Sequence, residues 1–599
     1  MKKNEKITSI TFNRTSNVFI NAGIVGLYRF INKYQIAHPN KFPSLNISPL
    51  SKDELTISCD TLLEFLEEVY YFMGKEIYDT PSQKQIDENY NVYYIEESDE
   101  FKRFPKMNTY GLTHLLTNNA QGVTRNKENS PKIAQLQKDN PVIAGKIKSY
   151  FESKGIKMLS KVYLDEPYTK ITRLEINEKY LQEGNNQCPL LGEPFKKLVE
   201  AKNVSPFISG LANFNSFLGS SEKYISWKAM YLIRFSPALC YFSYQNNYET
   251  LICNFFNSNN LENLAKLYEL PMFRQKEEMA KINYSLNFNL KDFSVKKKDG
   301  DSFKIETTKD AVWESEIAFM LLFTFYKDQF ESHIIDTENT EDNTFDPFAD
   351  NPIDKIPISL VSFRADKFSN TLRPNFYEEY NNVKYIIRLI YALESGEIRF
   401  QNIWQGLKLN SPKAKIMKSN LKTFNKGKAV ERQIRAIVLG KILKGYTIIN
   451  EIERLFFDSY KILIANENPG YRNYTKLLTF LLTYEKTLNN KSMDAELQEK
   501  SVNLGKQIAS SILRHENEKG DKSIEKINAK NGRKDIIKLH KARTWQQLTE
   551  AIIRLMKKYS LSNKIIANIN KENFFMVRQY SVIGALNVLN AVLTSSKND

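Results

Sequence analysis

The last third of the chain is dominated by apolar residues that recur at three- and four-residue spacing. This spacing places apolar side chains on one face of an α-helix, and short polar joins favour helices that pack as antiparallel neighbours. The sequence therefore predicts a mainly α-helical bundle over residues 373–599. The predicted helices span residues 385–393, 429–443, 449–464, 474–488, 497–513, 545–559 and 574–593.

The same third carries the positive charge of the chain. The 599 residues contain 85 Lys and Arg against 69 Asp and Glu, a formal net charge of +16 at pH 7. Residues 401–599 contain 36 basic and 17 acidic residues, a net +19, whereas residues 1–400 contain 49 and 52, a net −3. A coding bias towards lysine would spread the charge evenly. The segregation instead indicates a polyanionic partner, most simply nucleic acid, at the C-terminal third.

Residues 1–159 combine strand and helix patterns and predict an N-terminal α/β domain. Predicted strands span residues 7–12, 55–59 and 91–95, and predicted helices span residues 18–34 and 61–73, with a further helix from about residue 132.

Residues 160–372 carry most of the β signal and predict a middle domain with hairpins. One predicted hairpin pairs residues 231–244 with 248–255, and a second pairs residues 293–298 with 303–306. Asp299-Gly300 supports the second, because Asp-Gly accepts the positive φ angles of tight turns. Predicted helices span residues 261–282 and 311–330, so the expected fold class is α+β: a mixed α/β N-terminal and middle region with β-hairpins, followed by the helical bundle.

The sequence favours a protein of the cytoplasm without membrane contact. No apolar run approaches the roughly 20 residues needed to cross a bilayer, and no secretory apolar region follows the basic N-terminus. The four cysteines are isolated, as a reducing compartment permits. They are Cys59, Cys188, Cys240 and Cys253.

Motifs for catalysis and cofactor binding are missing from the sequence. The closest two of the five histidines, His515 and His540, are 25 residues apart, which rules out His-His metal spacing. Neither a phosphate-binding loop nor a Gly-Xaa-Ser-Xaa-Gly elbow occurs. We therefore expect no catalytic residue, no metal and no cofactor. The alternative is a metal-dependent DNA nuclease of a phage-defence system with a degenerate carboxylate site, for instance Asp165 and Glu175.

Three segments together resemble a known family. Residues 17–27, NVFINAGIVGL, form a predicted helix with closely spaced glycines, and they are followed by residues 188–192, CPLLG, and residues 207–217, FISGLANFNSF. This combination resembles the eighth Cas protein family, the large subunit of type I CRISPR Cascade complexes, especially its type I-B branch.

One departure from that family concerns zinc. Members of the branch often carry a Cys-Xaa-Xaa-Cys pair at the first of these cysteines and a second pair downstream. Here Leu191 stands in place of the second cysteine, and Cys240 and Cys253 form no such pair. A structural zinc ion needs about four ligands. We therefore predict that this chain has lost the zinc and that apolar packing replaces it.

The resemblance implies a non-catalytic subunit that lies beside the guide RNA and the other Cascade subunits. It implies recognition of a short protospacer-adjacent motif in target double-stranded DNA, support of R-loop formation by holding the displaced single strand, and recruitment of a helicase-nuclease. The basic C-terminal third agrees with this role, because a protein that binds backbone without reading sequence needs an electrostatic channel.

Two basic elements are the candidate backbone-binding sites, each with a solvated surface as its alternative. The first lies in residues 408–428, which contain no acidic residue. The second lies in residues 514–543, where lysines recur every four residues from Lys522 to Lys538, so that a helix would present them as one stripe broken near Gly532. The candidate residues are Lys413, Lys415, Lys418, Lys422, Lys426 and Lys428 in the first element, and Lys526, Lys530, Arg533, Lys534, Lys538, Lys541 and Arg543 in the second.

The polar stretch 118–127 is the leading candidate for reading the DNA motif, as an exposed loop. Amides and small backbone enter the minor groove, which suits Gln121 and Gly122. An ordinary turn is the alternative. The residues concerned are Asn118, Asn119, Gln121, Gly122, Thr124, Arg125 and Lys127, with Asn213, Asn215 and Lys223 as a second candidate group.

Met493 is a candidate internal start. In related type I-B systems, the small Cascade subunit is translated from within the large-subunit gene. Residues 493–599 are predicted to be entirely helical with a net charge of +8, so this segment has the composition of a separate small subunit. An ordinary methionine is the alternative.

Overall fold

The computed structural model of this protein divides the chain into two compact units, one formed by Met1–Phe288 with Lys327–Asn381 and the other by Asn289–Tyr326 with Asn382–Asp599. The structure describes residues 6–78, 92–95, 98–103, 120–124, 133–153, 155, 168–171, 174, 176–200, 224–245, 250–269, 294–296, 302–304, 313–326, 357–368, 371–396, 398–408, 422–425, 428–431, 434–467, 469, 473–488, 495–515, 521–562 and 564–595.

Helix α1 (Val18–Ala37) is the centre of the first unit. The side chain of Asn17 caps its N-terminus by accepting the backbone N–H of Phe19 at 2.9 Å and of Ile20 at 3.3 Å. One face of the helix packs on α9 (Trp227–Phe235). Gly26 leaves no room for a side chain there, because an added Cβ would lie 2.6 Å from the carbonyl oxygen of Phe235. The expected close-packed glycine helix is therefore confirmed.

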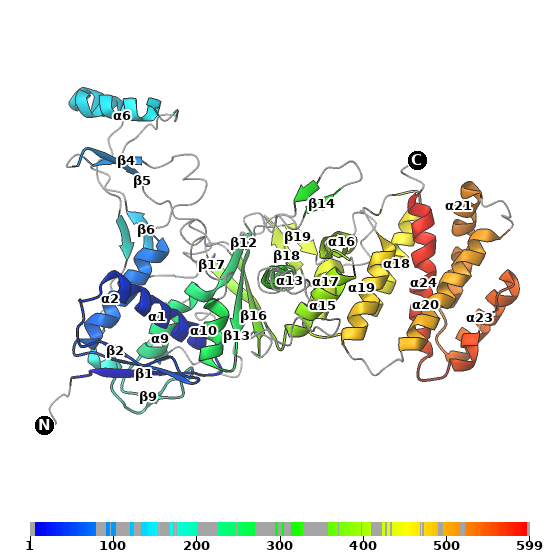
Figure 1. The fold of residues 1–599 in the computed structure, drawn as a ribbon, viewed down its shortest axis with the longest axis horizontal. Coiled ribbons are helices and arrows are strands. Elements are labelled where there is room, and N and C mark those ends of the chain that lie inside the picture. The colour runs from blue at the N-terminus through cyan, green and yellow to red at the C-terminus, as the bar shows by residue number, and fades with distance from the viewer. Residues whose placement is uncertain are drawn as a thin grey trace, which may run out of the picture. The chain divides into compact units, whose positions relative to one another are not determined.

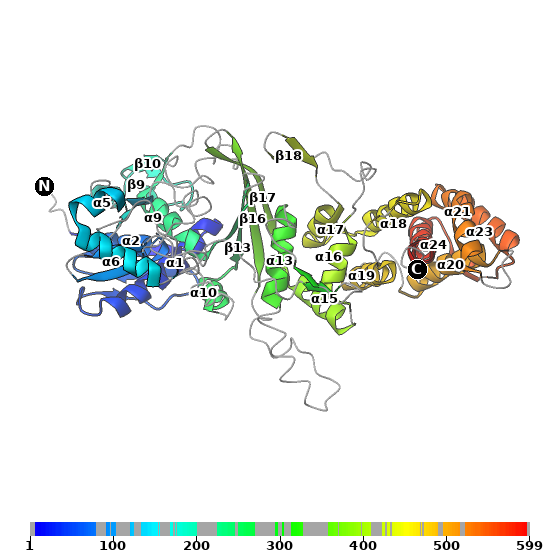
Figure 2. The same ribbon diagram turned by 90° about the horizontal axis from the view of Figure 1, so that it is seen from above.

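Two antiparallel sheets flank this helix. The smaller has the strand order β1 (Ser9–Asn13), β3 (Glu54–Ser58), β2 (Asn46–Ile47), and helix α2 (Leu62–Tyr78) follows it. The larger has the order β12 (Tyr241–Gln245), β13 (Thr250–Asn257), β16 (Ser359–Phe368), β17 (Thr371–Tyr380), and Figure 2 shows the last three side by side. The ring of Phe19 contacts those of Phe255 and Phe363, with centroids 5.5 and 4.9 Å apart, so α1 packs on this sheet.

A smaller module in the same unit has its own apolar core. Strands β4 (Val92–Ile95) and β5 (Glu100–Arg103) form an antiparallel hairpin, and helices α5 (Ile133–Asp139) and α6 (Pro141–Ser153) follow. The core contains Tyr94, Leu136, Ile143, Ala144, Ile147 and Phe151.

Short elements complete the described part of the first unit. The remaining strand pairs are β6 (Ala120–Thr124) with β7 (Tyr168–Ile171), β8 (Asn186–Gln187) with β9 (Pro194–Phe195), and β10 (Leu198–Glu200) with β11 (Tyr224–Ser226); the helices are α10 (Leu261–Glu269) and 3-10 turns at Glu178–Tyr180 and Ser236–Leu239.

The second unit is mainly helical. Its helices are α13 (Glu314–Tyr326), α15 (Lys384–Ser395), α16 (Phe400–Gly406), α17 (Ile434–Leu443), α18 (Ile449–Ile464), α19 (Tyr474–Thr487), α20 (Ala495–Arg514), α21 (Lys522–Asn531), α22 (Arg533–His540), α23 (Trp545–Tyr559) and α24 (Phe574–Ser595), with a 3-10 turn at Lys564–Asn568. Its strands form two hairpins, β14 (Ser294–Lys296) with β15 (Ser302–Lys304) and β18 (Lys422–Asn425) with β19 (Lys428–Glu431).

Two contacts fix the helices of this unit. The Arg435 guanidinium on α17 donates to the carboxylate of Glu316 on α13 at 2.7 Å, and both side chains are buried. The guanidinium carbon of Arg435 also lies 4.1 Å from the centre of the Trp404 ring. Further along the chain, α20 and α24 lie side by side (Figure 1). Gly505 of α20 lies against the backbone of Ser581, and Gly584 of α24 lies against the backbone of Val502. The glycines let these two backbones approach closely.

The predicted fold class, α+β with a helical C-terminal region, is confirmed, and several local predictions are wrong. Residues 227–235 form helix α9, whereas part of this segment was expected in a strand. Strand β17 runs through the expected boundary at residue 372, so the continuous C-terminal run of helices begins at Lys384. The predicted helix over residues 429–443 begins instead with strand β19. Both expected hairpins are present, as β12 with β13 and as β14 with β15.

Candidate nucleic-acid interface

Helices α21 and α22 carry the predicted lysine stripe. The Asp521 carboxylate caps α21 by accepting the backbone N–H of Ser523 at 2.7 Å. The stripe bends at Gly532, which ends α21 and begins α22. This glycine is buried, and an added Cβ would lie 2.6 Å from Cγ2 of Ile512 on α20. Close packing on α20 therefore divides the stripe, with Lys522, Lys526 and Lys530 on α21 and Lys534 and Lys538 on α22.

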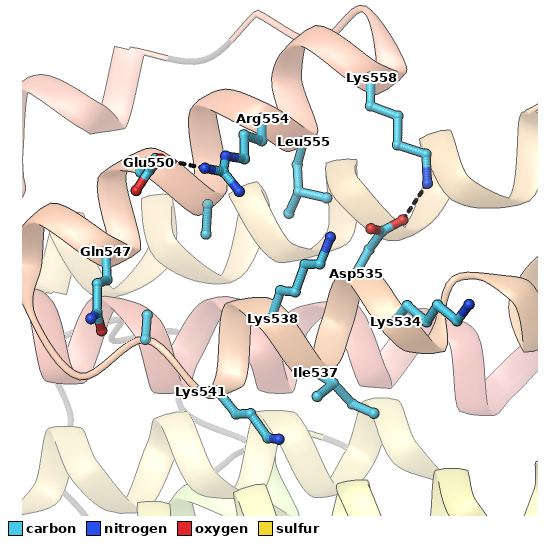
Figure 3. A pocket seen from close by; sticks show the side chains of 12 residues that line it. Lys534, Asp535, Ile537, Lys538, Lys541, Gln547, Glu550, Arg554, Leu555 and Lys558 are labelled. Atoms are coloured by element: carbon cyan, nitrogen blue, oxygen red, sulfur yellow. Dashed lines mark hydrogen bonds and ion pairs between the residues drawn. The ribbon is translucent and has the colours of Figure 1, made fainter.

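Helices α22 and α23 enclose a groove of about 600 Å³. Figure 3 shows its lining, in which the Lys538 side chain extends from α22 towards α23. Five basic and two acidic residues line the groove, so it carries a formal excess of three positive charges. Its charged lining residues are Lys534, Asp535, Lys538, Lys541, Glu550, Arg554 and Lys558.

Three of these lysines form an exposed row along α22. Lys534, Lys538 and Lys541 are exposed, and in the part of the chain that the structure describes none of them has an ion-pair partner. At 1.5 Å per helical residue, the three span about 10 Å along α22. Uncompensated lysines in a row repel one another, and this repulsion is relieved when an anion binds between them.

The α23 side of the groove is internally paired. The buried Asp535 carboxylate accepts from Nζ of Lys558 at 2.6 Å and from the hydroxyl of Tyr559 at 2.7 Å. The bond to Asp535 raises the pKa of Lys558, and burial raises the pKa of Tyr559. Arg554 pairs with Glu550 one turn away on the helix. Excess positive charge is therefore concentrated on the α22 side.

The sequence prediction missed the α23 residues of this groove. Glu550, Arg554 and Lys558 follow one another at four-residue intervals, which puts them on one face of the predicted helix. That spacing was a usable signal, but nothing local indicated that this face lies against α22.

The other residues of the second basic element have different surroundings. Lys526 is half-buried, and Lys530 donates to the Asn466 side chain at 3.0 Å. Arg533 and Arg543 are exposed, and Arg543 directly follows the groove residues Lys541 and Ala542. The structure thus brings Lys534, Lys538 and Lys541 together at the groove, whereas Arg543 is not among its lining residues.

The first basic element is only partly described. Lys413, Lys415, Lys418 and Lys426 lie outside the described residues. Lys422 and Lys428 lie in the β18–β19 hairpin, where Lys422 stands opposite Glu431 and Lys428 opposite Asn425. The C-terminal end of this element is therefore a β-hairpin.

The predicted motif-reading loop contains a strand. Gln121, Gly122 and Thr124 lie in β6, which pairs antiparallel with β7, so the expectation of a loop is wrong for residues 120–124. The pairing register shifts between Ala120 and Val123, which places Gln121 and Gly122 at a bulge, a feature that occurs often beside functional sites. The other residues of these two groups lie outside the described chain: Asn118, Asn119, Arg125, Lys127, Asn213, Asn215 and Lys223.

Cys188 lies in a tight hairpin between β8 and β9. Its backbone carbonyl accepts the N–H of Gly192, whose φ of +69° is the left-handed conformation that favours glycine. Its sulfur accepts the backbone N–H of Ser226 at 3.3 Å, and the side chain is fully buried. Within the described residues, no three His, Cys, Asp or Glu side chains are grouped so that they could hold a metal ion.

No helix in the described ranges has the length and apolar character needed to span a membrane. Comparison with models of known protein families and with curated proteins finds no match to this chain.

Proposed function

We propose that this chain binds nucleic acid without catalysing a reaction, as the large subunit of a type I-B-like CRISPR Cascade complex. The observation that carries the proposal is a row of three lysines along the α22 side of the α22–α23 groove, for which the described part of the chain supplies no ion-pair partner. A phosphate backbone supplies anions in a row, and its binding releases counterions and favours association.

The particular role follows the family that the sequence resembles. The sequence segments 17–27, 188–192 and 207–217 carry this resemblance. In that role the protein works in the cytoplasm beside guide RNA, recognises a protospacer-adjacent motif, holds the displaced strand at its basic helices and recruits a helicase-nuclease. Base pairing between the guide RNA and the target strand recognises most of the target sequence. The protein itself therefore needs only contacts with the phosphate backbone and residues that recognise the short adjacent motif.

Co-purification tests the proposal. The tagged chain is expressed with a repeat-containing RNA and the neighbouring Cas subunits, and the isolated complex is analysed for RNA and protein. We expect a ribonucleoprotein that contains this chain in a fixed ratio. Isolation of the chain free of RNA and subunits would contradict the Cascade role. DNA cleavage by the purified chain with magnesium or manganese would contradict the non-catalytic role.

A further inference from the structure

The helical unit presents an exposed aromatic ring beside the basic groove. Phe575, the second residue of α24, is 44% exposed. It is the one exposed Phe, Trp or Tyr among the residues that the structure describes in α20–α24. Trp545 and Tyr559 are half-buried, and Tyr580 is buried. Phe575 is thus set apart from the rings that form the core.

Arg578 fixes the ring and connects it to the groove. The guanidinium carbon lies 4.5 Å from the centre of the Phe575 ring, so the cation contacts the ring face. The same guanidinium donates from Nη1 to the carbonyl oxygen of Ala542 at 3.2 Å. Ala542 lines the groove and stands between the exposed cations Lys541 and Arg543.

We propose that Phe575 is a stacking platform for an unpaired base of a single-stranded nucleic acid whose backbone follows Lys534, Lys538 and Lys541. The inference rests on the proposed function and adds to it a residue that contacts bases. Proteins that hold single strands combine a basic groove with aromatic rings on which bases stack. Such stacking tolerates any sequence, because every base has a π face. A duplex keeps its bases paired within the helix, so the ring favours a single strand.

Oligonucleotides with and without bases separate stacking from backbone binding. Anisotropy titrations of the full-length protein use a labelled oligothymidylate and an abasic oligonucleotide of the same length. We expect the thymidylate to bind about tenfold more tightly, the order of effect expected for one stacked base. Phe575→Leu keeps an apolar side chain and removes the π face. It should abolish this preference and leave the affinity for the abasic strand unchanged.

Matched variants make the outcome decisive. Tyr446→Leu removes a ring that is 60% exposed elsewhere in the helical unit, and it should keep the wild-type preference. Phe575→Trp should also keep it and gain a fluorescence signal that the thymidylate quenches and the abasic strand does not. A thymidylate preference that survives in Phe575→Leu overturns the inference while lysine-dependent binding stands. If the wild type binds neither strand, the proposed function fails and this inference fails with it.

Discussion

The Nδ1 atom of His540, the last residue of α22, lies 2.8 Å from Oε1 of the buried Glu453 carboxylate on α18. The other oxygen of this carboxylate accepts from Nε2 of Gln579 on α24 at 2.9 Å, and the same amide donates to Asn450 at 2.5 Å. One carboxylate therefore joins α18, α22 and α24. Because Lys541 follows His540 directly, this network also fixes the end of the groove.

Removing the Glu453 carboxylate should destabilise the helical unit. Glu453→Ala leaves His540 without its partner and leaves the buried Gln579 amide with fewer acceptors. We expect the free energy of unfolding to fall by about 2 kcal/mol, the usual cost of breaking a buried polar network. Calorimetry of the helical unit's transition measures this change. Glu550→Ala, which removes an exposed pair with Arg554, should cost less than about 0.5 kcal/mol. Equal losses in the two variants would contradict a supporting role for Glu453.

Neutralising the α22 lysines should flatten the salt dependence of binding. The triple variant Lys534→Gln, Lys538→Gln and Lys541→Gln removes the three cations that we propose contact phosphates. On a single strand, the slope of log K against log salt should therefore become shallower by about 2.

A charge-matched triple variant in the other unit is the control for the lysine experiment. Lys138→Gln, Lys196→Gln and Lys266→Gln remove three exposed lysines and change the net charge equally. Their slope should match the wild type. A shift of the same size in both triple variants would show that only overall charge matters, and would rule out a specific role for the α22 row.

Parts of the helical unit could be predicted from sequence, because helices such as α18 and α23 are amphipathic. The predicted ranges 449–464 and 545–559 coincide with α18 and α23. Prediction failed at α9 because all nine of its residues are buried. A helix covered on every side shows no polar face, and its aromatic and β-branched residues then look like a strand. The place of α13 in the helical unit depends on long-range packing, which includes the contact of Glu316 with Arg435, more than a hundred residues away.

Only the α22 side of the α22–α23 groove could be predicted from the sequence. Lys534, Lys538 and Lys541 stand out in the sequence because they recur at four- and three-residue spacing, which places them on one face of a helix. The pairing of α22 with α23, by contrast, depends on side chains such as Asp535, whose long-range bonds to Lys558 and Tyr559 the spacing does not encode. Phe575 differs from core phenylalanines only in exposure, which emerges from the packing of the whole unit.

The close approach of α20 and α24 predicts a large effect of a single methyl group. In Gly505→Ala the new Cβ would overlap the backbone of Ser581, which has no flexible end to move away. We expect thermal unfolding to show a loss of about 3 kcal/mol, at the upper end for overpacking. Gly145→Ala in α6 meets nothing within 4 Å and replaces a helical glycine, so it should stabilise its module by about 0.5–1 kcal/mol. Similar losses for both would contradict the helix contact.

The bulge at Gln121 gives a test of motif reading. If this amide reads base edges, Gln121→Ala should reduce the affinity for motif-bearing duplexes by about tenfold, as for one lost base contact, and leave motif-free duplexes unaffected. Competition binding of the assembled complex measures the ratio of the two affinities. The triple variant of Lys534, Lys538 and Lys541 is the contrasting control. Loss of contacts with the phosphate backbone should weaken binding to motif-bearing and motif-free duplexes alike. Equal loss on both duplexes in Gln121→Ala would rule out a reading role.

The C-terminal helices give a test of the internal start at Met493. Helices α20 and α24 pack closely on each other, which favours folding of residues 493–599 as a separate product. The same segment also bonds to α18, through Asn590 to the Phe456 carbonyl at 3.0 Å and through Tyr460 to the Ala529 carbonyl at 2.5 Å. A separate copy would therefore expose an α18-facing side with unpaired polar groups. This side is suited to binding a surface like that of α18.

Expression of the gene with a C-terminal tag alone should yield a second tagged product of 107 residues beside the full-length chain. Met493→Leu should abolish the short product and keep the long one, whereas Met576→Leu, within α24, should keep both. A short product that persists in Met493→Leu would arise by cleavage of the full-length chain. That outcome would contradict internal initiation, because translation of the fragment requires the Met493 codon and proteolysis does not.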